Sequence, residues 1–295
     1  MYYSLYNETI VSSIPLEEFG VQKSEHPSLS SAITIEYAVS PSKIYTKYTN
    51  HQTSLNEDYG YYFIEDIAMF EIFSGKKIVV NHFNEIDNDV IHTLLNFPFA
   101  ILFNQRQKYV LHASSVFYED KVFCFCGSTQ SGKSSIASYL IKSGGSLISE
   151  DTCVFDLIND ELVILPSYNF IKLSDEVGQY TDIISSEPIT FLKKLTDRKG
   201  YVLASERFET RTRPVDYFIY LEWSEDDSIL KLLDNESSLK KILQNEFISY
   251  SKESSHIRFK AATRLINQAN HYLYSREKKL NTLDDFLAIV KKNML

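Results

Sequence analysis

Residues 125–154 read FCGSTQSGKSSIASYLIKSGGSLISEDTCV, and they contain the spacing G-x-x-x-x-G-K-S. An apolar run, KVFCFCG at residues 121–127, leads into the glycines and is typical of a β-strand. The run SSIASYLIKS at residues 134–143 places apolar residues on one face, as an amphipathic helix does. A glycine-rich loop between a strand and a helix binds phosphate, because its N–H groups and the helix N-terminus carry partial positive charge. The stretch therefore predicts an α/β fold built around a nucleotide-binding loop.

The loop also predicts which residues hold the nucleotide. In this motif the lysine, here Lys133, bridges the β- and γ-phosphates, and the hydroxyl of Ser134 ligates Mg²⁺. A chance match in a serine-rich loop is the weaker interpretation, because strand, loop and helix occur in the required order. The residues expected to contact the nucleotide are Gly127, Ser128, Thr129, Gln130, Ser131, Gly132, Lys133, Ser134 and Ser135.

Two carboxylates, Glu150 and Asp151, follow the helix and close a short strand. In a parallel arrangement with the strand before the loop, their side chains would lie beside the loop at the carboxyl edge of the sheet. Phosphoryl transfer needs a carboxylate for the metal and a group that orients or deprotonates the nucleophile. The pair could supply both, although a surface turn, SEDT at residues 149–152, is an equally simple interpretation.

His112 lies near the loop in sequence, in the strand before ASSVFYED. Imidazole suits proton handling near neutral pH, but a lone histidine is more often structural. Taken together, residues 111–151, LHASSVFYEDKVFCFCGSTQSGKSSIASYLIKSGGSLISED, resemble the catalytic core of bacterial HPr kinase/phosphorylase and its HPr-kinase-like relatives. In that family a histidine precedes a short hairpin, a Walker A loop follows, and a carboxylate pair comes one helix later.

The resemblance implies a fold related to ATP-dependent phosphoenolpyruvate carboxykinase, with ATP and Mg²⁺ as cofactors. It puts His112 at the family histidine and Glu150 and Asp151 at the family's Asp-Asp pair. By this resemblance Glu150 is the base toward an acceptor hydroxyl, supported by His112. Lys133 holds phosphates, and Ser134 and Asp151 hold the metal.

Two departures from the family pattern bear on the acceptor. First, Glu150 stands where the family has its first aspartate, so the choice of base between the two carboxylates stays open. Second, the family segment Glu-x-Arg-Gly-x-Gly is absent; the corresponding residues 165–177 read LPSYNFIKLSDEV. The layout is closer to HPr-kinase-like proteins of peptide biosynthetic clusters, including lasso-peptide kinases that phosphorylate a precursor's carboxyl-terminal serine. Those proteins share a β-rich amino-terminal part, the LHAS entry and a P-x-Y…K-L segment like residues 166–173. The resemblance implies a peptide or small-protein acceptor.

The rest of the chain divides into two predicted domains, 1–105 and 106–295. The first is β-rich, with strands predicted at residues 32–39, 61–66, 69–73 and 77–83 and a polar break at 50–60. Helical spacing covers residues 85–107, with Pro98 bending or interrupting the run. In the second domain, residues 214–223 resemble the family's later core strand. Residues 237–295 form a mostly helical tail whose periodicity includes 258–274.

Composition narrows the partners. The 295 residues carry 30 basic and 39 acidic side chains, a net charge of −9, which disfavours nucleic-acid phosphates and anionic membranes as partners. No signal segment or long apolar run is evident, so a soluble, cytoplasmic protein is expected. The three cysteines, Cys124, Cys126 and Cys153, are expected to be small core residues. The sequence does not indicate an oligomeric state.

A basic segment lies between Lys193 and Arg213 in this otherwise acidic chain. Cations stabilise a transferred phosphoryl group, and Lys199 is the favoured candidate because the HPr-kinase-like relatives tend to carry a basic residue there. A solvated charged loop is the simpler alternative.

The leading hypothesis is an ATP-dependent serine kinase. The alternatives are a non-catalytic nucleotide-binding regulatory or scaffold module and a kinase of a small hydroxylated metabolite.

Overall fold

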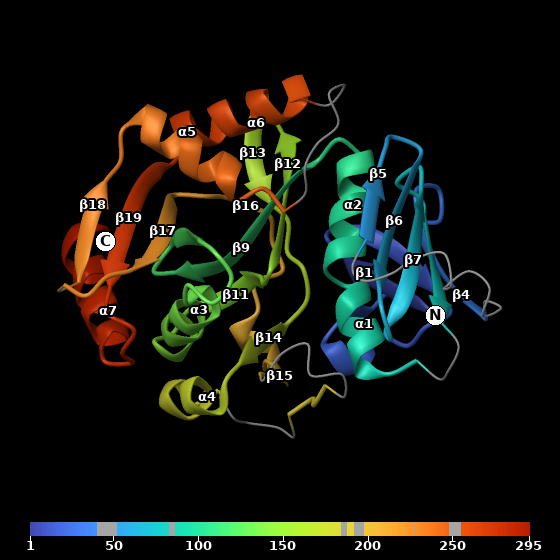
Figure 1. Cartoon of the computed structure of the whole chain (residues 1–295), viewed down its shortest axis with the longest axis horizontal. Helices are drawn as coiled ribbons and strands as arrows, with labels where there is room; N and C mark the ends of the chain where they lie inside the picture. Colours follow the sequence, from blue (N-terminus) through green and yellow to red (C-terminus); the bar gives the residue numbers. More distant parts are fainter. Residues whose placement is uncertain (40–51, 83–85, 184–187, 192–197, 227, 248–254) are drawn as a thin grey trace.

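The computed structural model describes residues 1–39, 52–82, 86–183, 188–191, 198–226, 228–247 and 255–295. Two large β-sheets lie side by side, and helices α1 (Asn88–Leu94) and α2 (Phe97–Gln105) lie between them (Figure 1). The first sheet is built from the amino-terminal residues, and the second contains the strand that leads into the glycine loop. The predicted α/β class, with a β-rich amino-terminal region and helices in the tail, is confirmed.

The first sheet has the strand order β3-β1-β2-β4-β8-β7-β6-β5. All four strands predicted from β-branched and aromatic runs are present, as β4, β6, β7 and β8. The polar break predicted at residues 50–60 contains β5, which pairs antiparallel with β6. The strands are β1 (Tyr2–Leu5), β2 (Glu8–Ser12), β3 (Gln22–Lys23), β4 (Ile33–Val39), β5 (Gln52–Leu55), β6 (Tyr59–Ile64), β7 (Ala68–Phe73) and β8 (Lys77–His82).

The helical run around Pro98 is two helices. Asp87 caps α1 by accepting a hydrogen bond from the Val90 N–H at 3.0 Å, and α2 begins at Phe97 with Pro98 in its first turn. Proline is tolerated there because a first-turn N–H has no partner within the helix. The predicted interruption at Pro98 is therefore confirmed.

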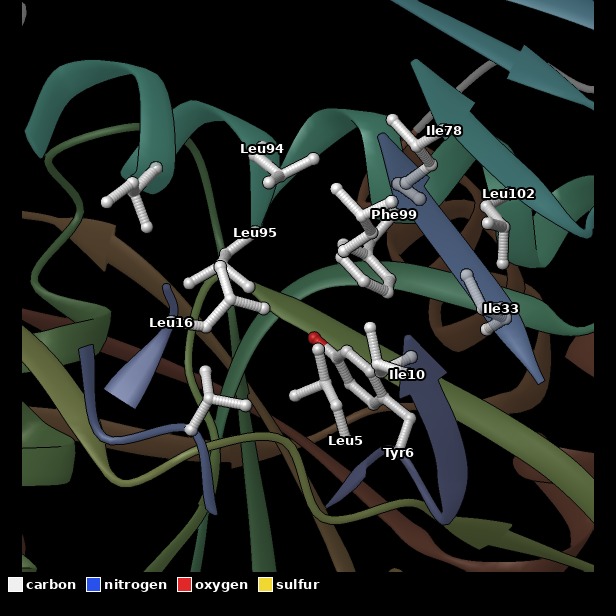
Figure 2. Close-up of a cluster of buried hydrophobic side chains, with 14 of the residues drawn as sticks. Leu5, Tyr6, Ile10, Leu16, Ile33, Ile78, Leu94, Leu95, Phe99 and Leu102 are labelled. Atoms are coloured by element: carbon white, nitrogen blue, oxygen red, sulfur yellow. The ribbon is translucent and has the colours of Figure 1, made fainter. Parts of the chain in front are cut away.

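The helices join the two sheets through a shared hydrophobic core. Figure 2 shows Leu94, Leu95 and Phe99 of this pair facing Leu5 and Ile10 of the first sheet region. The same buried cluster continues into the second sheet through Val110, Val154 and Val163. In addition, the Tyr6 hydroxyl donates to the Thr152 carbonyl at 2.9 Å, across the boundary predicted at residue 105. The division into two domains there stays a prediction.

The second sheet has the order β16-β13-β12-β9-β10-β17-β19-β18, and β11 pairs with β9 beside β12. The long strand β9 therefore contacts three strands of the motif region. The strands of the second sheet are β9 (Tyr109–Tyr118), β10 (Lys121–Cys126), β11 (Ser146–Ser149), β12 (Thr152–Ile158), β13 (Glu161–Ile164), β16 (Arg213–Pro214), β17 (Tyr217–Trp223), β18 (Ile229–Leu232) and β19 (Asn270–Arg276).

Helices cover both faces of this sheet. On one face, α3 (Lys133–Lys142) and α7 (Thr282–Asn293) pack over Phe123 and Phe125. On the other, α5 (Asn235–Gln244) and α6 (Ser255–Gln268) pack over Cys124 and Cys126. The alternation in β10 reflects the two-residue period of a strand, which sends successive side chains to opposite faces. All three cysteines are buried thiols, so the prediction that they are core residues is confirmed.

The tail contains the predicted helices, but it also contributes a strand to the sheet. Helical periodicity predicts helix through residue 274, whereas α6 ends at Gln268 and β19 begins at Asn270. β19 pairs in parallel with β17 from Tyr217↔Asn270 to Trp223↔Arg276, so a tertiary partner outweighs the local helical pattern. The remaining elements include β14 (Phe170–Leu173), α4 (Asp175–Thr181) and β15 (Lys199–Val202). Across the described part of the chain, no helix has the length and apolar character that crossing a membrane requires.

Candidate functional site

The glycine loop connects β10 to α3, in the strand, loop and helix order that the motif requires (Figure 1). Two of its glycines have positive φ angles, 151° at Gly127 and 95° at Gly132. A Cβ atom at Gly127 would lie 2.5 Å from Ser131 Oγ, and one at Gly132 would lie 2.5 Å from Arg276 Nη2. Conformation and space therefore both require glycine at these two positions.

Lys133 closes the loop from inside. Its side chain is only 5% exposed, and Nζ donates to the carbonyls of Gly127 at 2.9 Å and Ser128 at 3.1 Å. Burial lowers the pKa of Lys133, although the charges of Asp151 and Glu150 oppose the shift. The ammonium thus lies among N–H and carbonyl groups that a phosphate chain could reach, where it could exchange these two carbonyls for phosphate oxygens.

Ser134 and Glu150 form the first carboxylate contact of the site. Ser134 Oγ donates to Glu150 Oε1 at 2.5 Å, whereas the buried Glu150 Oε2 makes no hydrogen bond of normal geometry among the described residues. The Ser114 hydroxyl nevertheless lies close enough to lower the pKa of Glu150. Burial, followed by the charge of Asp151, raises the pKa of Glu150 to about 7. The resemblance implies that Ser134 and Asp151 hold the metal; in the structure the Ser134 hydroxyl contacts Glu150, and the metal ligands stay a prediction.

Glu150 and Asp151 lie in a tight turn between β11 and β12. The Thr152 N–H donates to the Glu150 carbonyl at 2.7 Å, and Asp151 has a φ of 59°, which are features of a γ-turn. Aspartate tolerates this left-handed region better than most residues. The turn sends the two neighbouring carboxylates in different directions, which explains why they have different partners.

Asp151 contacts two cationic or ionisable groups. Its Oδ1 lies 3.8 Å from His112 Nε2, and its Oδ2 lies 2.9 Å from Lys172 Nζ. Although burial opposes ionisation, Lys172 and then His112 hold the pKa of Asp151 well below its ordinary value. The Asp151 side chain is 20% exposed, whereas Glu150 is 3% exposed, so Asp151 is the more accessible of the two carboxylates.

The strand directions explain why these groups meet. The sequence predicts that the carboxylate pair follows a strand parallel to β10, the strand before the loop. The strand that precedes the pair is β11, and β11 is not a direct neighbour of β10. Both strands pair antiparallel with β9, from opposite sides. They therefore run in the same direction, and their carboxyl ends reach the same edge of the sheet. His112 lies on β9 itself, directly opposite Thr152.

Lys172 is a site residue that sequence reasoning did not single out. It lies on β14 and is 13% exposed, and its Nζ is 2.8 Å from His92 Nε2 as well as 2.9 Å from Asp151. Burial, together with the Lys172 charge, holds the pKa of His92 well below its ordinary value, so a neutral imidazole can accept from the ammonium. The available signal was the P-x-Y…K-L segment, but only the fold places its lysine against Asp151.

A cavity of about 530 Å³ is lined by Lys172 and by Ser134 of the phosphate loop, and its volume is within the range of small-molecule sites. It joins the phosphate loop to residues from the carboxyl-terminal part of the chain. Its lining carries five cationic side chains and one carboxylate: Lys172, Arg198, Arg276, Lys278 and Lys279, with Glu176. In a chain of net charge −9, such a lining concentrates positive potential at the cavity and favours an anionic ligand.

The structure does not bring Lys199 to this cavity. Lys199 is paired with Asp175 at 2.8 Å, and it shares a face of the antiparallel β14–β15 strand pair with Leu173, opposite the face that carries Lys172. Arg211 and Arg213 are bound to Glu209. Lys193 and Lys194 lie outside the described residues. Of the described part of the basic segment, Arg198 lines the cavity.

No family model matches the chain, and no curated protein matches it in sequence. A solved structure of the Hpr(Ser) kinase/phosphatase from Coxiella burnetii is similar, with a TM-score of 0.34 and 12% sequence identity. The likeness covers 62% of this chain and 88% of that chain.

The raised pKa of Glu150 predicts a specific pH dependence of stability. Because its pKa of about 7 in the folded protein exceeds the ordinary value of 4.5, the folded state binds more protons between these values. The free energy of unfolding of the ligand-free protein should therefore fall by about 1–3 kcal/mol from pH 5 to pH 8 through this group. Urea unfolding at the two pH values measures the change. Glu150→Gln should remove it, and the exposed Glu161→Gln should not; an equal fall in E150Q would contradict the assignment.

Proposed function

We propose that this protein is an ATP-dependent kinase that transfers the γ-phosphoryl group to a hydroxyl, with a serine of a peptide or small protein as the expected acceptor. The observation that carries the proposal is the divergence of two adjacent carboxylates at the phosphate loop. Glu150 contacts Ser134 of the loop, and Asp151 faces outward beside two further polar groups. A kinase needs both environments, one for the metal and one for the acceptor.

Ser134 and Glu150 would hold Mg²⁺. The fit rests on Glu150 Oε2, which makes no hydrogen bond of normal geometry among the described residues, and on the adjacent serine hydroxyl, both of which are hard oxygen donors. Among the described residues, no three His, Cys, Asp or Glu side chains gather as a metal site, and Mg²⁺ commonly takes one or two carboxylates together with substrate phosphates. When bound, the ion would neutralise charge on the phosphate oxygens.

Asp151 is the proposed base. In the transfer step, the acceptor oxygen bonds to the γ-phosphorus while the bond from that phosphorus to the bridging oxygen of ADP breaks. The hydroxyl proton passes to the Asp151 carboxylate, which is ionised and partly exposed. This assignment departs from the resemblance, which gives the base role to Glu150. Glu150 is almost fully buried, and one of its oxygens is occupied by Ser134. His112 then supports Asp151 instead of Glu150.

Lys172 is the proposed cation for the transferred group. Its ammonium has three N–H donors, and the described contacts with Asp151 and His92 use two of them. Lys172 also lines the cavity, so its remaining donor can stabilise charge on the phosphoryl oxygens of a ligand bound there. His92 acts as a positioning residue, because it holds the lysine from the helix layer between the two sheets.

Substitution of the two carboxylates separates their roles. Asp151→Asn should lower kcat at least about 100-fold, because it removes the proton acceptor, while the Kd for ATP stays near the wild-type value. Glu150→Gln should instead raise the Mg²⁺ concentration needed for ATP binding. Transfer is followed by mass spectrometry with ATP, Mg²⁺ and a library of serine-containing peptides, and binding by calorimetry. Retained transfer in D151N, with loss confined to E150Q at saturating Mg²⁺, would restore Glu150 as the base.

The same assay distinguishes the alternative functions. Tight ATP binding by the wild-type protein without product from any peptide or metabolite pool would favour a non-catalytic nucleotide-binding module. Product from the metabolite pool alone would identify a kinase of a small hydroxylated compound.

Two lysines on opposite faces of the β14–β15 strand pair provide a matched test of which cation stabilises the transferred phosphoryl group. Lys172→Met should lower kcat about 100-fold with little change in the Kd for ATP, because it removes a donor to the developing charge. Lys199→Met, on the other face of the same strand pair, should leave kcat unchanged. Initial rates with a saturating acceptor peptide measure both. A loss in K199M together with normal turnover in K172M would reverse the assignment.

A further inference from the structure

Arg276 is a buried cation without a counter-charge among the described residues. It ends β19 and is 3% exposed. Its Nη1 donates to Thr282 Oγ1 at 2.7 Å and to the Lys279 carbonyl at 3.3 Å, whereas Nε has no partner. No carboxylate in the described ranges forms an ion pair with it. A buried charge is costly unless it is paired, so this guanidinium is suited to an anion that the described residues do not supply.

Its position indicates where that anion would bind. Arg276 Nη2 lies against the phosphate loop, 2.5 Å from where a Cβ on Gly132 would be. The guanidinium carbon lies 4.4 Å from the centre of the Trp223 ring, and Trp223 Nε1 donates to the Gln130 carbonyl at 3.1 Å. The tryptophan thus contacts both the loop and the arginine, and its ring stabilises the guanidinium charge by a cation–π interaction.

The surrounding cavity has the matching charge. Arg276 and Trp223 line the same 530 Å³ space as Gly132 and Ser134 of the loop, together with further cations. A planar guanidinium presents paired N–H donors that match the oxygens of a phosphate, and burial strengthens such contacts. The anion that meets this description is the phosphate chain of a nucleotide at the loop.

We propose that Arg276, held by Trp223, is a direct ligand of the phosphate chain of the bound nucleotide and so provides a second cation opposite Lys133. The inference rests on the proposed function for the identity of the ligand as a nucleotide, but it does not require phosphoryl transfer. It assigns to β19 and β17, far from the Walker motif in sequence, a part in nucleotide affinity.

Binding of ATP and of inorganic tripolyphosphate, each with Mg²⁺, tests the proposal, because the two share the phosphate chain and only one has a base. Calorimetry on Arg276→Gln should show both ligands weakened about 10- to 100-fold, as expected for loss of a charge-assisted hydrogen bond. Arg276→Lys, which keeps the charge but loses the planar fork, should fall between R276Q and wild type. Unchanged affinity for both ligands in R276Q would overturn the proposal, as would a loss confined to ATP, which would indicate a contact with the base.

Two further readouts separate a ligand from a structural residue. Trp223 is the only tryptophan in the chain, so its emission should change when wild-type protein binds tripolyphosphate and should change less in R276Q. Because no carboxylate in the described ranges depends on Arg276, the Tm of ligand-free R276Q should stay within a few degrees of wild type. A large fall in Tm with unchanged Kd would make the residue structural; if R276Q does not fold, the R276K affinities decide.

These outcomes are distinct from failure of the proposed function. A wild-type protein that binds ATP but phosphorylates nothing removes the kinase and leaves the Arg276 measurement intact. Unchanged R276Q affinity in an active kinase removes only the present inference, and a wild-type protein that binds neither ligand removes both.

Discussion

The backbone pairing of β9 is the interaction on which the arrangement of the site depends. Along one edge, residues Ala113 to Tyr118 pair with β10 and so position the strand that leads into the phosphate loop. Along the other edge, β9 pairs with β11 and β12, and the break between those two strands is where Glu150 and Asp151 lie. One strand therefore fixes both the loop and the carboxylates, and it also carries His112.

The γ-turn at Asp151 gives the two adjacent carboxylates different surroundings. An extended backbone would send them to opposite faces of the sheet. The left-handed residue instead keeps both at the sheet edge while giving them separate neighbours, a hydroxyl for Glu150 and cationic or ionisable groups for Asp151. Their pKa values move in opposite directions: burial raises the pKa of Glu150, whereas at Asp151 burial is opposed by Lys172 and His112, which together hold the pKa well below its ordinary value. The Tyr6 hydroxyl, on the Thr152 carbonyl, ties this turn to the amino-terminal region.

The parts of the site that follow from local sequence were predictable. The Walker spacing requires its own strand and helix, so the loop, Lys133 and Ser134 could be placed without a structure. The partners of the two carboxylates could not, because a positive φ at Asp151 has no signature in the letters ED. Lys172, His92 and Arg276 were also inaccessible, since each reaches the site through a tertiary pairing. Arg276 was further hidden by a helical periodicity in a segment that the sheet recruits as β19. The same limit applies to Lys199: the order of residues does not reveal that it lies on the face of the antiparallel β14–β15 strand pair opposite Lys172.

A crystal structure with Mg²⁺ and a non-hydrolysable ATP analogue would test whether the two carboxylates have separate roles. We expect Ser134 and Glu150 to bind the metal ion. Lys133 should have moved from the Gly127 and Ser128 carbonyls onto phosphate oxygens, and the Asp151 carboxylate should face the γ-phosphate without binding the metal. A structure in which Asp151 and Ser134 hold the metal while Glu150 turns outward to the γ-phosphate would contradict this expectation.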